Sequence, residues 1–147
     1  GLPDGNLLSQ GKTASASNAS AYYPASLAND GDYATRWIAS SGSWTPTPWW
    51  CVDLGDSHEI RNVQISWWTY KGSEAYYKYL IETSQDGTNF TTALDRSGSR
   101  IYGFTSDTLP AGTNARYVRV KMLDAVLFNN PSNWYTPTLW EVKVYGN

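Results

Sequence analysis

Three oxygen-bearing side chains lie close together near residue 30, around a single glycine. Asp30 and Asp32 flank Gly31, and the hydroxyl of Thr35 follows. Carboxylates, hydroxyls and backbone carbonyls are the hard ligands that calcium prefers, about six to eight at a time. Residues 27–35 therefore have the residue types of a calcium loop. An ordinary Asp-Gly turn would show the same spacing, and the spacing alone favours that simpler interpretation.

A second set of side chains suits the recognition of sugars. A monosaccharide has an apolar C–H face on which an aromatic ring can stack, and hydroxyls that amide and charged groups can read. Residues 38–49, 69–77 and 128–137 are long, aromatic and turn-rich, and binding residues concentrate on such loops. The predicted sugar contacts are Trp44, Trp68, Tyr70, Lys71, Glu74, Asn129, Asn130, Trp134 and Tyr135, with Tyr22 as a further contact.

Some of these residues have a structural alternative. Trp44 and Trp134 could anchor their own loops instead of stacking on a ligand. Lys71 and Glu74 could be solvated loop charges, which is the commoner fate of such residues. The loop sequences alone leave these alternatives open.

The chain has few residues that could serve in nucleophilic or metal-assisted catalysis. The chain has one histidine, His58, and one cysteine, Cys51, so a catalytic triad would depend on His58, and a zinc site of ordinary composition lacks ligands. A carboxylate pair for glycoside hydrolysis could be drawn from 13 acidic residues, but no spacing favours any pair. We predict no catalytic residues, and we expect Cys51 to be a half-buried, inert thiol.

Length, charge and composition limit the number of domains and the kinds of partner that this chain can have. The 147 residues predict one domain over 1–147, and the net charge of −2 argues against a nucleic-acid partner, which needs a basic surface. No apolar stretch approaches the ~20 residues that cross a membrane. The chain holds 8 Trp and 11 Tyr but only 3 Phe, more amphipathic rings than a core alone requires.

The sequence pattern predicts β-strands as the elements that position the candidate calcium and sugar contacts. Val63, Ile65 and Trp67 alternate with polar residues, as do residues 118–122 and 142–145. Turn chemistry lies between the strands, at Asp-Gly, Ser97-Gly98 and Pro-Ala-Gly sequences, and His58 falls in an apparent turn after Gly55. Residues 25–29 predict one short helical turn. The class is all-β, a sandwich or barrel, with Trp37, Trp50, Trp67 and Trp140 assigned to the core.

The order of several motifs resembles the discoidin, or coagulation factor 5/8 type C, family, and within it most closely the bacterial family 32 carbohydrate-binding modules. The motifs are Asn29-Asp30-Gly31-Asp32 with Thr35-Arg36-Trp37, Trp49-Trp50-Cys51-Val52-Asp53-Leu54-Gly55, residues 60–65, Tyr79 to Gly87 with Phe90, Arg116 to Val120, and Trp140 to Gly146. Each motif alone is weak, but six in the right order make a chance match very unlikely.

The resemblance implies a jelly-roll-like β-sandwich of about eight strands, with sugar contacts from loops at one end. It implies a structural calcium ion, with ligands from Asp30, Asp32 (side chain or backbone), Thr35, Glu141 and the Leu27 carbonyl. It further implies a secreted bacterial module, monomeric and tethered to a glycan-active enzyme, that binds an oligosaccharide or the end of a polysaccharide chain.

Two departures and one alternative accompany the resemblance. Galactose binders of the family commonly carry a histidine in the first loop, and this chain has none there. Cys51 stands where a polar residue is frequent. The alternative is a membrane- or cell-surface-binding adhesion module that uses Trp44 and the pair Trp134-Tyr135 as apolar tips. Anionic membranes favour basic residues beside such tips, and here Lys71 is accompanied by Glu74, so we favour sugar over lipid.

Overall fold

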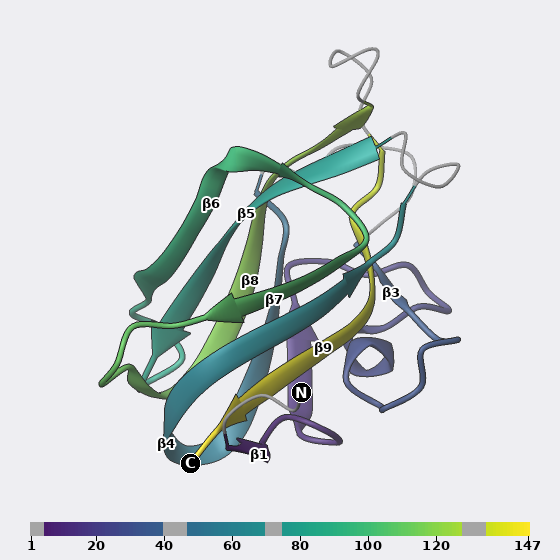
Figure 1. Cartoon of the computed structure of the whole chain (residues 1–147). Coiled ribbons are helices and arrows are strands. Elements are labelled where there is room, and N and C mark those ends of the chain that lie inside the picture. Colours follow the sequence, from purple (N-terminus) through teal and green to yellow (C-terminus); the bar gives the residue numbers. More distant parts are fainter. Residues whose placement is uncertain (1–4, 40–46, 70–74, 128–134) are drawn as a thin grey trace.

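Strands make up most of this computed structural model, which describes residues 5–39, 47–69, 75–127 and 135–147 (Figure 1). The strands are β1 Asn6–Leu7, β2 Thr13–Ala16, β3 Trp37–Ile38, β4 Trp49–Trp67, β5 Ala75–Ser84, β6 Thr91–Ile101, β7 Phe104–Thr108, β8 Asn114–Leu127 and β9 Thr138–Gly146. A single 3₁₀ turn, η1 Ala25–Ala28, confirms the helical turn predicted there. No helix in the described ranges has the length and apolar character needed to cross a membrane.

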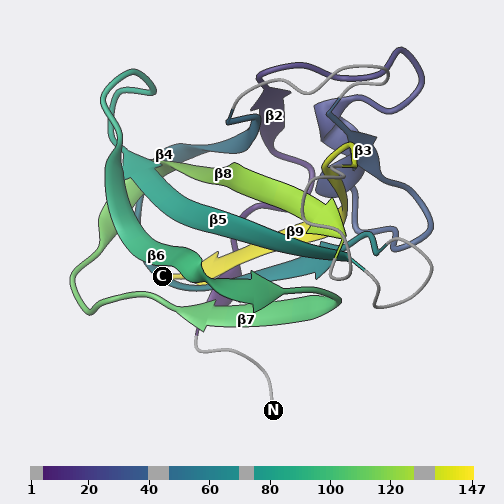
Figure 2. The same ribbon diagram turned by 90° about the horizontal axis from the view of Figure 1, so that it is seen from above.

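The strands form two packed layers that share β4 (Figure 2). One layer has the order β2–β4–β8–β5–β6, and the other places β4 between β7 and β9, with β1 and β3 on the far edge of β9. All of these strand pairs are antiparallel. The predicted β-sandwich is confirmed, and the described residues form nine strands where about eight were expected.

The 19-residue β4 passes from one layer to the other without a loop. Its register with β8 is irregular between Asp53 and His58, and Gly55 has a φ of 91°, which only glycine adopts readily. The predicted turn around His58 is therefore wrong, because a bulged strand can absorb a glycine that sequence patterns assign to a turn. The predicted Ser97-Gly98 turn is wrong as well, because β6 continues through both residues.

The core confirms the alternating pattern that the sequence shows. Trp37 and Trp50 are fully buried and Trp67 is 2% exposed. Trp140 is only half-buried, which corrects its assignment to the core. The ladder between β4 and β9 slips by one residue there, since Ser66 pairs with Glu141 and Trp67 with Leu139, so Trp140 has no opposite residue on β4.

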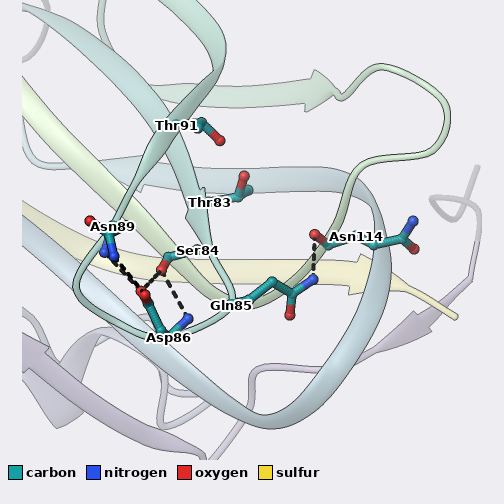
Figure 3. Close-up of a pocket in the computed structure, with 7 residues that line it drawn as sticks. All are labelled: Thr83, Ser84, Gln85, Asp86, Asn89, Thr91 and Asn114. Atoms are coloured by element: carbon teal, nitrogen blue, oxygen red, sulfur yellow. Dashed lines mark hydrogen bonds between the residues drawn. The ribbon is translucent and has the colours of Figure 1, made fainter.

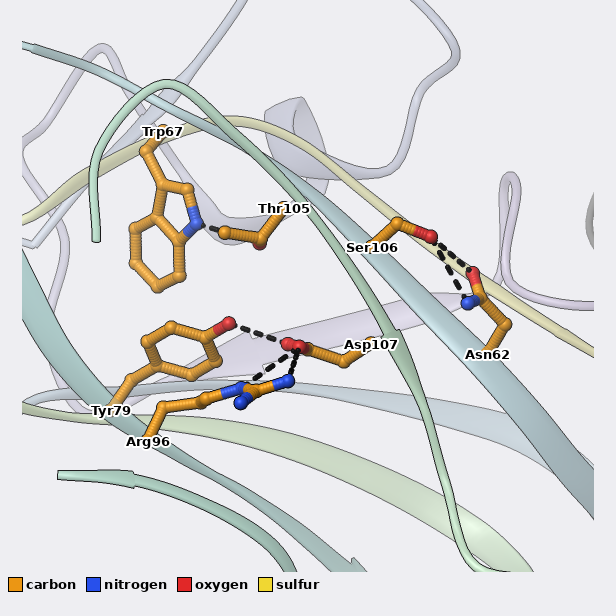
Figure 4. Close-up of polar contacts among 7 residues, drawn as sticks. All are labelled: Asn62, Trp67, Tyr79, Arg96, Thr105, Ser106 and Asp107. Carbon is orange, nitrogen blue, oxygen red and sulfur yellow. Dashed lines mark hydrogen bonds and ion pairs between the residues drawn. The ribbon is translucent and has the colours of Figure 1, made fainter. Parts of the chain in front are cut away.

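A polar network links β6, the edge strand of one layer, to β7, the edge strand of the other layer (Figure 4). Asp107, 3% exposed, accepts hydrogen bonds from the Tyr79 hydroxyl and from two nitrogens of Arg96, at 3.0 and 2.8 Å. Trp67 Nε1 donates to Thr105 Oγ1 at 2.9 Å. Because these bonds tie β7 to β5 and β6, they hold the β6–β7 hairpin against the sandwich.

Candidate functional site

The strand ends that flank the three predicted loops meet at one end of the sandwich, here called the loop end. The Ala39 amide donates to Pro137 O at 3.0 Å, and the Trp68 amide donates to Thr138 O at 3.1 Å. At the same end Ala75 pairs with Leu127. Seven predicted sugar contacts lie outside the described residues: Trp44, Tyr70, Lys71, Glu74, Asn129, Asn130 and Trp134. They stay predictions, and Trp68, Tyr135 and Tyr22 can be placed.

Four rings form a continuous line from the core to the loop end. Trp67 and Tyr77 lie 4.5 Å apart, Tyr77 meets Tyr135 edge-on at 5.2 Å, and Tyr135 lies 5.7 Å from Trp68. The Tyr77 hydroxyl lies 3.0 Å from Trp68 O and 3.1 Å from Thr138 O. Trp68 is the half-buried outer member of this line, so packing underneath fixes the position of a ring that a sugar could contact.

Tyr135 supports this ring from below. It is 8% exposed, its hydroxyl donates to Tyr76 O at 3.0 Å, and burial raises its pKa, so the hydroxyl stays a donor. The structure thus gives Tyr135 a packing role, and its direct contact with sugar stays a prediction. Tyr76, placed in a loop by the sequence, lies in β5 and is 3% exposed, which corrects that assignment.

Tyr22 belongs to the same end of the molecule through a chain of backbone bonds. It is 86% exposed. The flanking residues pair with β3, since Ser20 N donates to Ile38 O and Ile38 N donates to Tyr23 O. Ile38 in turn pairs with Thr138, the residue that bonds to Trp68. The backbone on either side of Tyr22 is therefore linked through β3 and β9 to the backbone of Trp68.

Oxygen atoms predicted to bind calcium converge on the hydroxyl of Thr35. Thr35 Oγ1 lies 2.6 Å from Asp30 Oδ2, 3.1 Å from Asp32 O and 3.3 Å from Leu27 O. The Asp32 carboxylate instead accepts the amide of Ala34 at 2.8 Å, which leaves its carbonyl as the oxygen facing the cluster. The structure brings these four predicted residues together.

Glu141 reaches the same loop from β9. It is 2% exposed, and its Oε2 accepts the Gly31 amide at 2.9 Å, while its Oε1 is buried without a hydrogen-bond partner. Burial, and then the charge of Asp30, raise the pKa of Glu141 to about 7. In the described part of the chain no three His, Cys, Asp or Glu side chains form a metal-binding group. A cation here would rely on carbonyls and Thr35 beside the carboxylates, which is the mixed donor set that calcium accepts.

A polar cleft lies at the opposite end of β5 (Figure 3). Thr83, Ser84, Gln85, Asp86, Asn89, Thr91 and Asn114 line it. The Asp86 carboxylate already accepts the amides of Thr88 and Asn89 and the Asn89 side chain, at 2.7 to 2.9 Å. No aromatic ring lines the cleft, so it lacks the stacking surface that a pyranose requires.

Residues 12–141 match the F5/8 type C domain. The chain belongs to this family. No curated protein matches the chain at a significant level. The order of motifs along the sequence therefore identified the family correctly, and the β-sandwich is the scaffold that the resemblance implied.

Solved structures of this F5/8 type C fold include chitosan-binding modules. A variant of chitosan-binding module 1 from the chitosanase/glucanase of Paenibacillus sp. IK-5 is 33% identical, with a TM-score of 0.80 and coverage of 97% of this chain and 99% of that chain. Module 2 of that enzyme, solved in complex with chitotriose, is 30% identical, with a TM-score of 0.77 and coverage of 95% and 99%. A Clostridium perfringens module in complex with GalNAc-β-1,3-galactose is 20% identical, with a TM-score of 0.77 and coverage of 96% and 100%, and shares the fold.

Proposed function

We propose that this F5/8 type C domain is a non-catalytic carbohydrate-binding module whose loop end binds a terminal sugar or short oligosaccharide of the chitosan type. The observation that carries the proposal is the near-complete coverage of chitosan-binding modules at 30 to 34% identity. The positions of Trp68 and Tyr22 at one strand terminus support it, because sugar recognition needs rings held on a rigid scaffold.

The predicted loop residues supply the polar half of such a site. A glucosamine unit carries an ammonium group at neutral to acidic pH, and we assign the carboxylate of Glu74, one of the two predicted charged contacts, as its partner. Asn129 and Asn130 are the predicted readers of hydroxyls, since a wrong epimer would leave an amide unpaired. One small site of this kind binds weakly, from about micromolar to millimolar, because few ligand atoms are buried.

A calcium ion bound by Leu27 O, Asp30, Asp32 O, Thr35 and Glu141 is part of the proposal. The buried Oε1 of Glu141 without a partner supports it, because a cation would compensate a carboxylate that is otherwise expensive to bury. When bound, the ion would link residues 27–35 to β9 and neutralise the charges of Asp30 and Glu141. Its role would be structural, because it would tie a loop near the start of the chain to the last strand.

The biological setting follows the similar modules and is part of the same proposal. We place the domain as a monomeric module of a secreted bacterial glycan-active enzyme, which it holds near its polysaccharide. The support is that chitosan-binding modules 1 and 2 derive from a chitosanase/glucanase. Near the two ends of the described chain, β1 pairs with β9, with Asn6 opposite Gly146.

A panel of immobilised glycans tests the proposed function. Retention on glucosamine oligomers, with no release of reducing ends from the same sugars, is the expected result. Binding to anionic vesicles with no retention on any glycan would replace the proposal by the membrane alternative. Release of reducing ends would overturn the non-catalytic part.

A further inference from the structure

Two exposed aromatic rings lie at the tip of the β6–β7 hairpin, which is not one of the three predicted sugar loops. Tyr102 is 48% exposed and Phe104 is 57% exposed, while most large apolar side chains of the described residues are buried or half-buried. Gly103 lies between them with a φ of 78°, which gives the hairpin a tight tip that carries a ring on each side. Single exposed apolar residues are ordinary, but two on a three-residue tip form a local apolar surface.

The hairpin tip lies directly beside the strand end that leads into Trp68. The Trp67 amide donates to Gly103 O at 2.7 Å, and Phe104 pairs with Ser66, two residues before Trp68. On the other strand of the hairpin, Ile101 pairs with Tyr77. Both views of the ribbon show the β6–β7 connection next to the end of β4 (Figures 1 and 2). The hairpin tip therefore lies next to the loop end, at the side of the sandwich formed by β6 and β7.

The alternation of β7 directs Phe104 away from the core. Thr105 accepts the indole N–H of the buried Trp67, so its side chain points inward. Neighbouring residues of a strand point to opposite faces, so Phe104 and Ser106 lie on the outer face. The Ser106 side chain, two residues further along the same face, is hydrogen-bonded to the side chain of Asn62. Phe104 therefore offers an exposed apolar ring on the outer face, and such a ring can stack on the C–H face of a pyranose.

We propose that Tyr102 and Phe104 form a second aromatic subsite, which contacts the sugar units that follow the one bound at Trp68. The inference rests on the proposed function, because the occupant is the same oligosaccharide. Continuity of the hairpin with the strand end at Trp68 argues for this occupant. Arg100, which lies 5.2 Å from the Tyr76 ring, precedes the tip, and one basic residue is fewer than a membrane-binding tip favours.

Calorimetric titration with glucosamine oligomers, from the dimer to the hexamer, tests the subsite. The wild-type domain should bind the hexamer roughly tenfold more tightly than the dimer, since one added ring contact of 1 to 1.5 kcal/mol is worth about that factor. The double variant Tyr102→Ala/Phe104→Ala should keep the wild-type affinity for the dimer and lose most of the gain with length. Tyr33→Ala is the matched control: its ring is 52% exposed over Lys143 of β9, and it should keep the gain.

The outcomes separate this inference from the proposed function. If the wild type binds no oligomer of any length, the proposed function is wrong, and the subsite that rests on it is wrong as well. If it binds all lengths equally, or if the double variant keeps the full gain while its melting temperature is unchanged, the hairpin is not a subsite. If the double variant loses vesicle binding instead of a length-dependent gain, the rings contact lipid.

Discussion

The ring of Trp68 lies 5.7 Å from the ring of Tyr135, at a tilt of 52°. Tyr135 is in turn fixed by Tyr77, so the half-buried indole stands on a rigid aromatic base. Replacing Trp68 with Ala should lower affinity for chitotriose at least tenfold, because it removes the stacking ring. The free energy of unfolding should fall by only about 1 to 2 kcal/mol, because the indole is half-buried. Titration and a denaturant melt measure both.

Tyr117 offers the matched control for this substitution. Its half-buried ring packs at Gly87, next to the β5–β6 turn and far along the sheet from Trp68. Tyr117→Ala should cost a similar amount of stability and leave sugar affinity unchanged. Equal loss of affinity in both variants would show that destabilisation, and not a missing contact, explains the effect.

Calcium should stabilise the folded domain. Removal of the metal by a chelator should lower the melting temperature without abolishing the fold, because a ligand that binds only the native state adds to stability by linkage. Glu141→Gln should abolish the rise in melting temperature on adding calcium. An identical melt with and without calcium, on protein shown to be metal-free at the start, would contradict the proposed ion.

The same carboxylate should make the metal-free domain sensitive to pH. Because the folded-state pKa of Glu141 is raised from 4.5 to about 7, the native state binds the extra proton in that interval. Stability from this group is present below pH 4.5 and is lost as the pH rises towards 7. In chelator, Glu141→Gln should therefore gain stability relative to wild type between pH 5 and 8, on the order of 2 to 3 kcal/mol at most. A constant difference between the two melts across this range would contradict the assignment.

The Cys51 thiol should be unreactive in the native state. It is 5% exposed, and burial raises its pKa to about 12, so almost no thiolate exists at neutral pH. A thiol reagent at pH 8 should label the chain only after denaturant is added. Labelling at the rate of a free cysteine in native buffer would contradict the buried position.

Removal of Arg96 should weaken the sandwich without affecting the sugar site. Arg96→Met leaves the buried carboxylate of Asp107 with the Tyr79 hydroxyl alone, at an expected cost of about 2 kcal/mol in the free energy of unfolding. Arg61→Met, which breaks the partly exposed pair with Glu59, should cost about 0.5 kcal/mol or less. Equal losses measured by urea unfolding would contradict the special role of the Asp107 network.

The fold could be predicted well from the sequence, because apolar and polar residues alternate along the individual strands. The strands around Val63, Val118 and Val142 each show a clean period of two, and burial follows it. Gly55 and Gly98 misled the prediction for the opposite reason. A glycine indicates backbone freedom, and only pairing with a distant strand decides whether that freedom makes a turn or a bulge.

The candidate site could be predicted only in part. Asp30, Thr35 and Glu141 lie together because β9 places Glu141 beside the Gly31 amide, 110 residues away in sequence, and the family pattern indicated that pairing. Tyr135 has the same residue type as a stacking platform, yet it packs inward through a bond to Tyr76. The sequence analysis did not predict Tyr102 and Phe104 as ligand contacts, because the register of β4 with β7 is what brings Phe104 opposite Ser66, close to the strand end before Trp68.

Calorimetric titration of the wild-type domain with chitotriose, with tryptophan fluorescence recorded in parallel, tests the central claim most directly. The account predicts saturable one-site binding between about micromolar and millimolar, a fluorescence change, and loss of both in the Trp68→Ala variant. Folded wild-type protein that shows neither heat nor a fluorescence change with chitotriose, or with any other sugar of the glycan panel, would contradict the account.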